Sequence, residues 1–162
     1  MKDELLKLAE DALEILRKAS RGIRHLPGDE PEPGIRSGNY WETLRDKAAK
    51  ALELLPDLHE RKSYTVSTEL SLYAVERMTE AAVIRKYVVA GKLEHGRIFE
   101  EAAELGIMDR DLAAYLSRMF RYRADMYYRT GIGTRELSTK LRKLAETLWA
   151  LLALDENGPK TK

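Results

Sequence analysis

The apolar residues of this chain recur mainly at the 3.6-residue spacing of amphipathic α-helices. The first stripe extends from Lys2 to about His25, and Gly22 and Pro27 then weaken and stop the helix that it predicts. Its members are Leu5, Leu8, Ala9, Ala12, Leu16, Ala19 and Ile23. Residues 26–38 follow with three prolines and three glycines, and they predict a long loop outside the core.

A second helix is predicted over residues 40–62. Asn39 and Glu42 stand at its start with the spacing of a capping box, in which each side chain bonds to the backbone of the other. Pro56 lies inside this range. Because proline lacks the backbone N–H that a helix interior uses, either the helix kinks there or it ends near Leu54.

A third helix is predicted over residues 64–90, closed by Gly91. Its apolar residues occupy most of the helical circumference, as the following positions show: Val66, Leu70, Tyr73, Ala74, Val75, Met78, Ala81, Ala82, Ile84, Val88 and Val89. A helix that is apolar nearly all round is surrounded by other helices. We therefore expect this helix to be the central one.

The rest of the chain predicts a short helix over residues 97–105, a fourth long helix over 109–130 and a last helix over 134–155. No strand pattern competes with these helices. Long helices with mostly short connections favour an all-α fold, an antiparallel up-and-down bundle of four to five helices. We expect one domain over residues 1–155, followed by a flexible tail over 156–162.

The composition favours a globular protein with a heavily charged surface. Apolar residues make up 44% and charged residues 34%, and the net charge is only +1, unlike that of a basic nucleic-acid coat. The N-terminus is amphipathic and carries acids, and no uncharged apolar run approaches a membrane span, so we expect a cytoplasmic protein. The absence of glutamine, together with abundant charge, is typical of thermophiles.

No metal site or cofactor is expected. There is no cysteine, and His25, His59 and His95 lie far apart without a second ligand at metal spacing. Gly131 and Gly133 follow a helix rather than a strand, so they indicate a helix end rather than a phosphate-binding loop.

The fourth long helix carries a charge within its apolar face. Arg123 falls near the middle of a face formed by Leu112, Leu116, Met119, Phe120, Met126 and Tyr127. A guanidinium there needs a carboxylate, a wet cavity or another subunit, because an unpaired buried charge is costly. Glu69, Glu76 and Glu80 share one face of the third helix and are the expected acid partners.

Two interpretations of this helix remain open. In the first, arginine and glutamate form an internal network that sets the register of two helices, which the cost of burying charge favours. In the second, Arg118, Arg121 and Arg123 line an anion-binding cleft, because guanidinium groups bind phosphate bidentately. Asp125 and Tyr128 gather near Arg118 and Arg121 on one arc of the helix and would belong to that cleft.

Residues 120–128, FRYRADMYY, resemble the signature helix of the HEPN superfamily, whose members carry Arg-x4-His or R-x-x-A-D-Y motifs. Arg121 corresponds to the motif arginine, Ala124 and Asp125 to the A-D pair, and Tyr128 to the trailing tyrosine. The resemblance extends weakly over residues 65–155. It implies a helical bundle that forms a homodimer, with its signature helices meeting at a cleft.

Met126 occupies the position of the catalytic histidine, so the resemblance implies a non-catalytic relative. Such a relative would bind a nucleotide or RNA phosphate and could pair with a nucleotidyltransferase-type protein. One alternative is a purely structural or protein-interaction bundle with an internal Arg–Glu network. A second is a metal-independent ribonuclease that uses Tyr127 or Tyr128 in place of histidine, although an unperturbed phenol is a poor base at neutral pH.

Overall fold

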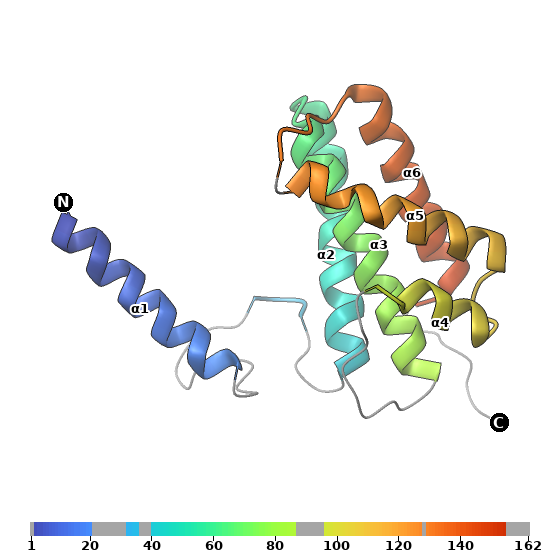
Figure 1. Ribbon diagram of the computed structural model, residues 1–162, viewed down its shortest axis with the longest axis horizontal. Helices are drawn as coiled ribbons and strands as arrows, with labels where there is room; N and C mark the ends of the chain where they lie inside the picture. Colours follow the sequence, from blue (N-terminus) through green and yellow to red (C-terminus); the bar gives the residue numbers. More distant parts are fainter. Residues whose placement is uncertain (1, 21–31, 36–39, 87–95, 128, 155–162) are drawn as a thin grey trace.

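The computed structural model describes residues 2–20, 32–35, 40–86, 96–127 and 129–154. All regular structure in these ranges is helical, which confirms the predicted all-α class (Figure 1). The helices are α1 (Lys2–Ser20), α2 (Tyr40–Glu60), α3 (Tyr64–Lys86), α4 (Ile98–Glu104), α5 (Arg110–Tyr127) and α6 (Arg135–Leu152).

Helix α3 lies at the centre of the bundle, as its all-round apolar pattern predicts. It contacts α2, α6, α4 and α5. Its fully buried side chains include Val75, Met78 and Ala81. Because every neighbour removes a different strip of α3 from water, the helix needs no single apolar face.

The structure bears on the predicted ends of the second helix and of the fourth long helix. Helix α2 continues through Pro56 to Glu60, so the proline does not end it. Helix α5 ends at Tyr127, before the predicted end near Thr130. The predicted last turn of the third helix, residues 87–90, lies outside the described residues.

The core follows α3, and α2, α4, α5 and α6 also contribute side chains to it. The Phe99 ring of α4 is fully buried, and its centroid lies 4.8 Å from that of Phe120 on α5. Around this pair pack Met78, Ile98, Leu116, Leu148 and Leu154. Helix α4 thus anchors α5 over α3, and this placement brings the arginines of α5 close to the acids of α3.

The connection from α5 to α6 packs tightly against the start of α3. The backbone N–H of Gly133 donates to Thr65 Oγ1 at 2.9 Å, and a Cβ at Gly133 would lie 2.5 Å from the carbonyl oxygen of Tyr64. Only glycine fits this approach. Thr134 then begins α6, as predicted, and its side chain accepts a hydrogen bond from the Leu137 N–H.

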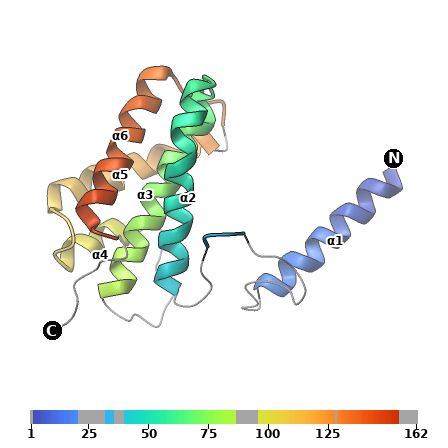
Figure 2. The same cartoon turned by 180° about the vertical axis from the view of Figure 1, so that it is seen from behind.

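Helix α1 stands apart from the other helices (Figures 1 and 2). Among the described residues, it makes no tertiary contact with α2–α6. The sequence placed all helices in one unit over residues 1–155, whereas the packed unit in the structure consists of α2–α6. Of the helices that the structure describes, none is long and apolar enough to cross a membrane.

Candidate functional site

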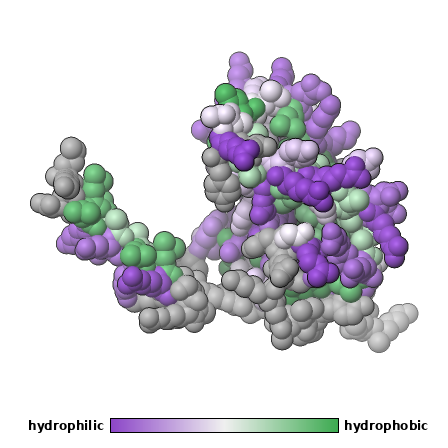
Figure 3. All heavy atoms as spheres, in the orientation of Figure 1, coloured by the Kyte–Doolittle hydropathy of each residue, from purple (hydrophilic) through white to green (hydrophobic). Residues whose placement is uncertain are grey.

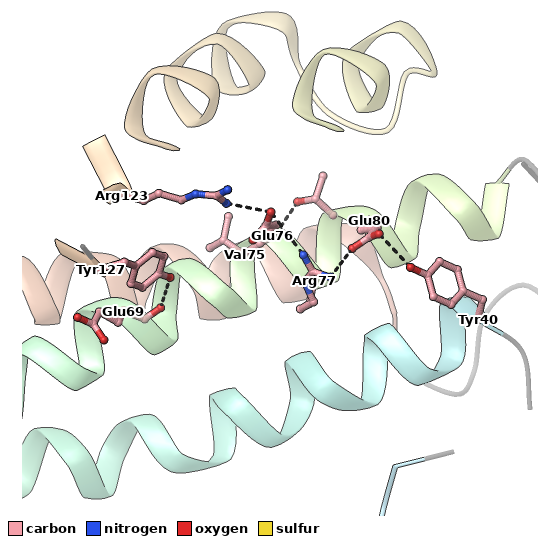
Figure 4. Close-up of polar contacts among 9 residues, drawn as sticks. Tyr40, Glu69, Val75, Glu76, Arg77, Glu80, Arg123 and Tyr127 are labelled. Carbon is pink, nitrogen blue, oxygen red and sulfur yellow. Dashed lines mark hydrogen bonds and ion pairs between the residues drawn. The ribbon is translucent and has the colours of Figure 1, made fainter. Parts of the chain in front are cut away.

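Arg123 forms an ion pair with the central helix. Its Nη1 lies 2.9 Å from Oε1 of Glu76, and the two side chains are 29% and 9% exposed (Figure 4). The guanidinium carbon also lies 5.4 Å from the centroid of the Phe120 ring. Of the three ways to compensate this cation that the sequence left open, the structure shows a carboxylate of the third helix.

The ion pair belongs to a network that spans three helices (Figure 4). Glu76 Oε1 lies 3.4 Å from Arg77 Nη2, and Arg77 Nη1 lies 2.8 Å from Glu80 Oε2. The Tyr40 hydroxyl of α2 donates to Glu80 Oε1 at 3.4 Å. Two of the three expected acid partners, Glu76 and Glu80, thus hold α5, α3 and α2 in register.

The third expected acid, Glu69, lines a pocket of about 570 Å³ between α3 and α5. The other lining residues are Val66, Leu70, Tyr73, Glu76, Arg123 and Tyr127. The Tyr127 hydroxyl donates to the backbone carbonyl of Glu69 at 2.8 Å. Two carboxylates face one guanidinium here, so this pocket is not an anion site.

A second hollow, of about 470 Å³, lies between α4 and α5 and is rich in arginine. It is lined by Glu100, Ala103, Glu104, Arg110, Ala113, Ala114, Ser117, Arg118 and Arg121. The three arginines are exposed, and none forms an ion pair with a residue that the structure describes. The hydroxyl of Ser117 is buried without a hydrogen-bond partner. This hollow has the cations and the unused donor that an anion requires.

The three arginines expected in one cleft are divided between two hollows. Arg118 and Arg121 line the α4–α5 hollow, whereas a smaller hollow of about 280 Å³ is lined by Arg121 and Arg123. The expectation of a single cleft lined by all three is therefore corrected, because Arg123 turns toward α3. The side chain of Asp125 and all of Tyr128 lie outside the described residues.

Two tyrosines on the outer face of α5 were not singled out from the sequence. Tyr115 is 64% exposed and Tyr122 is 70% exposed. The guanidinium carbon of Arg118, which lies between them on the same helical face, is 5.3 Å from the Tyr115 ring centroid. Alternating tyrosine and arginine at helical spacing, YLSRMFRY, was the available signal.

His59 is a structural residue rather than part of a catalytic group. Its Nδ1 lies 3.3 Å from Ser138 Oγ, and the Ser138 hydroxyl donates to Ser67 Oγ at 2.9 Å. Both serines are fully buried, so no substrate reaches their hydroxyl groups. The other two histidines, His25 and His95, lie outside the described residues.

Comparison with known proteins identifies a family but no activity. A family model described as "Domain of unknown function (DUF8154)" matches residues 7–156, and this range includes most of α1 as well as α2–α6. No curated protein and no solved structure matches the chain. The resemblance of residues 120–128 to the HEPN signature helix stays a prediction.

Proposed function

The chain belongs to the family of the domain of unknown function DUF8154, and we propose that it binds a nucleotide or single-stranded RNA on the outer face of α5. The carrying observation is that exposed arginines and exposed tyrosines alternate there, above the arginine-rich hollow between α4 and α5. Each residue type supplies a different part of the recognition.

The arginines bind phosphate. Arg110, Arg118 and Arg121 outnumber the two glutamates of the hollow, Glu100 and Glu104, so an anion entering it meets net positive charge. A guanidinium presents paired N–H donors that fit two phosphate oxygens, and it stays charged at every physiological pH. None of the three forms an ion pair with a side chain that the structure describes.

The tyrosines bind bases. An exposed ring offers a flat apolar surface on which a base stacks, and such stacking contributes about 1–3 kcal/mol per base. Tyr115 and Tyr122 stand on either side of Arg118 along one face, so a phosphate held by Arg118 has a ring on each side. This arrangement recognises a phosphate group and a base that are linked in one molecule. Nucleotides and single-stranded RNA both have these two groups.

The test is a salt-dependent binding measurement. Fluorescence anisotropy of a labelled oligouridine should report binding at low salt that weakens as salt rises, because bound phosphates release counterions. Arg118→Ala combined with Arg121→Ala should weaken binding at least tenfold and make the salt dependence shallower. Tyr115→Ala combined with Tyr122→Ala should weaken binding with the salt dependence unchanged.

The matched control is Arg135→Ala combined with Lys143→Ala, which removes the same charge from exposed positions of α6. Equal weakening by both double variants would show only general electrostatic attraction and would overturn the proposal. Competition with ATP separates the two ligands. If ATP displaces the oligomer at similar concentration, the site takes a mononucleotide, and if it does not, the site needs a strand.

A structural and protein-interaction role is the second candidate, and the Arg123–Glu76 ion pair favours it. This pair and its extension to Tyr40 lock three helices together without any ligand. A chain with only this role would fail to bind the oligouridine at low salt while folding normally. The same measurement therefore separates the two candidates.

A ribonuclease that uses tyrosine is the weakest candidate. The Tyr127 hydroxyl is already donated to the backbone of Glu69, on the side of α5 that faces α3. The homodimer and the nucleotidyltransferase-type partner that the family resemblance implies stay predictions.

A further inference from the structure

Helix α1 carries an apolar face that no other helix of the described residues covers. Leu5, Leu8 and Leu16 are 61%, 59% and 65% exposed, and they share one side of the helix. Figure 3 shows the apolar side chains of α1 gathered along one edge and the hydrophilic ones along the other. A stripe of this length is unusual on a free surface, and an isolated helix of 19 residues depends on packing for much of its stability.

Helix α3 has one uncovered face of matching character. Its other sides are closed by α2, α4 and α6, whereas Val66, Leu70 and Tyr73 line the pocket beside α5. Val66 is 52% exposed, and Leu70 and Tyr73 are half-buried. These positions recur every three to four residues, so they form an apolar strip along the helix.

We propose that α1 docks with its leucine stripe on this strip of α3 in its own chain, between α2 and α5. This inference goes beyond the proposed function and does not depend on it, because the strip lies on the side of α5 opposite the Tyr115–Arg118 face. Helix α1, with 19 residues, is about 28 Å long, and this face of α3 extends beyond the strip to Glu80, about 21 Å from Val66, so α1 would cover both the strip and the ion pairs next to it.

The charges on this face of α3 tolerate such a cover. Glu76, Arg77 and Glu80 are already paired with one another and with Arg123, and their side chains are 9%, 15% and 5% exposed. An apolar helix that packs over these residues would bury charges that already form ion pairs. Glu69 stays at the edge of the strip, where it can remain in water.

The position of the connecting segment favours the same chain as the donor of α1. Helix α2 begins at Tyr40, whose hydroxyl contacts Glu80 at one end of the strip. The connection over residues 21–39 reaches about 60 Å when extended, about twice the length of α1. Within it, Glu32 lies close enough to Tyr73 to contribute to the raised pKa of that phenol. A tethered helix is also present at high effective concentration.

A membrane surface fits the stripe less well. Helices that lie on membranes carry a basic polar face. The polar face of α1 instead mixes Lys7 with Glu10 and Glu14.

Disulfide trapping tests the proposal, since the chain has no native cysteine. Ala12→Cys on the stripe with Leu70→Cys on the strip should oxidise to a cross-linked chain of monomer mass. Lys7→Cys with Leu70→Cys, which places the thiol on the opposite side of α1, is the matched control and should cross-link at least fivefold less. Ala12→Cys with Val66→Cys repeats the measurement at an exposed position that cannot disturb the core.

Each outcome of the cross-linking experiment either supports or overturns the docking of α1 on α3. Monomer-mass cross-links in excess of the control, in either stripe variant, support docking within the chain. Cross-links of dimer mass at dilute concentration would mean that α1 covers a second copy, and they overturn the proposal. Equal cross-linking of stripe and control variants, or none in variants that keep their helix content by circular dichroism, would mean that α1 has another occupant or none.

Discussion

Arg123 on α5 and Glu76 on α3, far apart in the sequence, are joined by an ion pair of 2.9 Å at the edge of the core. Arg118 and Arg121 line the hollow between α4 and α5, and Arg121 also lines a smaller hollow together with Arg123. One helix therefore carries a cation that is paired within the fold and other cations that are exposed beside a hollow.

Replacing Arg123 with methionine should destabilise the protein. Glu76 would lose its nearest cation while remaining buried, and a buried acceptor that loses its partner costs about 1–3 kcal/mol. Chemical denaturation should report this loss as a lower free energy of unfolding. The matched control is Arg121→Met, an exposed arginine of the same helix, which should change stability by less than about 0.5 kcal/mol.

Adding Glu76→Leu to Arg123→Met should recover part of the lost stability, since it removes the buried carboxylate that has lost its nearest cation. The two changes should show a coupling of about 1 kcal/mol in a double-mutant cycle. Strictly additive effects would mean that the 2.9 Å contact contributes nothing to the fold.

Substituting Gly133 with alanine should also destabilise the protein. The new Cβ would lie 2.5 Å from the Tyr64 carbonyl oxygen and 2.7 Å from Thr65 Cα, both in the backbone, so the α5–α6 connection would have to move. We expect a loss of about 1–3 kcal/mol in thermal or chemical unfolding. Gly96→Ala is the control, because a Cβ there meets no atom within 4 Å. An equal effect at both glycines would contradict the close approach.

Tyr73 should make the protein less stable at alkaline pH. Burial, as the main cause, raises the pKa of its phenol above the ordinary value of 10.0, and Glu76, Glu80 and Glu32 raise it further while Arg77 lowers it. The pKa of Tyr73 is higher in the folded than in the unfolded chain. Its contribution to the free energy of unfolding is therefore fully present below pH 10 and is lost as pH rises through the folded pKa.

Denaturation midpoints measured from about pH 9 to about pH 11 check this dependence. Tyr73→Phe should flatten the alkaline decline, whereas Tyr122→Phe, at a position that is 70% exposed, should leave it unchanged. If stability declines equally with pH in both variants, titrating groups other than Tyr73 cause the alkaline loss of stability.

The need for an acid near Arg123 could be predicted because it follows from local pattern and general cost. A cation within an apolar stripe has to be compensated wherever the helix packs, and the glutamates of α3 were the acids on the central helix. Which of them it contacts could not be predicted, because a rotation of either helix by one residue would exchange Glu76 for another. The buried pair of Arg45 and Asp46, with Nη2 and Oδ1 2.8 Å apart, gave no signal in the sequence.

For the candidate site, too, part could be predicted from the sequence and part could not. The sequence placed Arg123 on the apolar face of the helix and Arg118 and Arg121 on another arc, and it left open whether one cleft contains all three. A helical wheel gives the angles of the side chains but not the neighbouring helices that would form a cleft. The exposure of Tyr115 and Tyr122 follows from the absence of a covering helix, which is a fact about neighbours and not about spacing.

By itself, the sequence determined the helices, their order and the central place of α3, because 3.6-residue periodicity and the capping of α6 are local properties of the chain. Only the tertiary structure decided that Arg123 pairs with Glu76 and that Gly133 meets the backbone of α3. These depend on how close helices approach and at what rotation, and the packing of many distant side chains sets both at once.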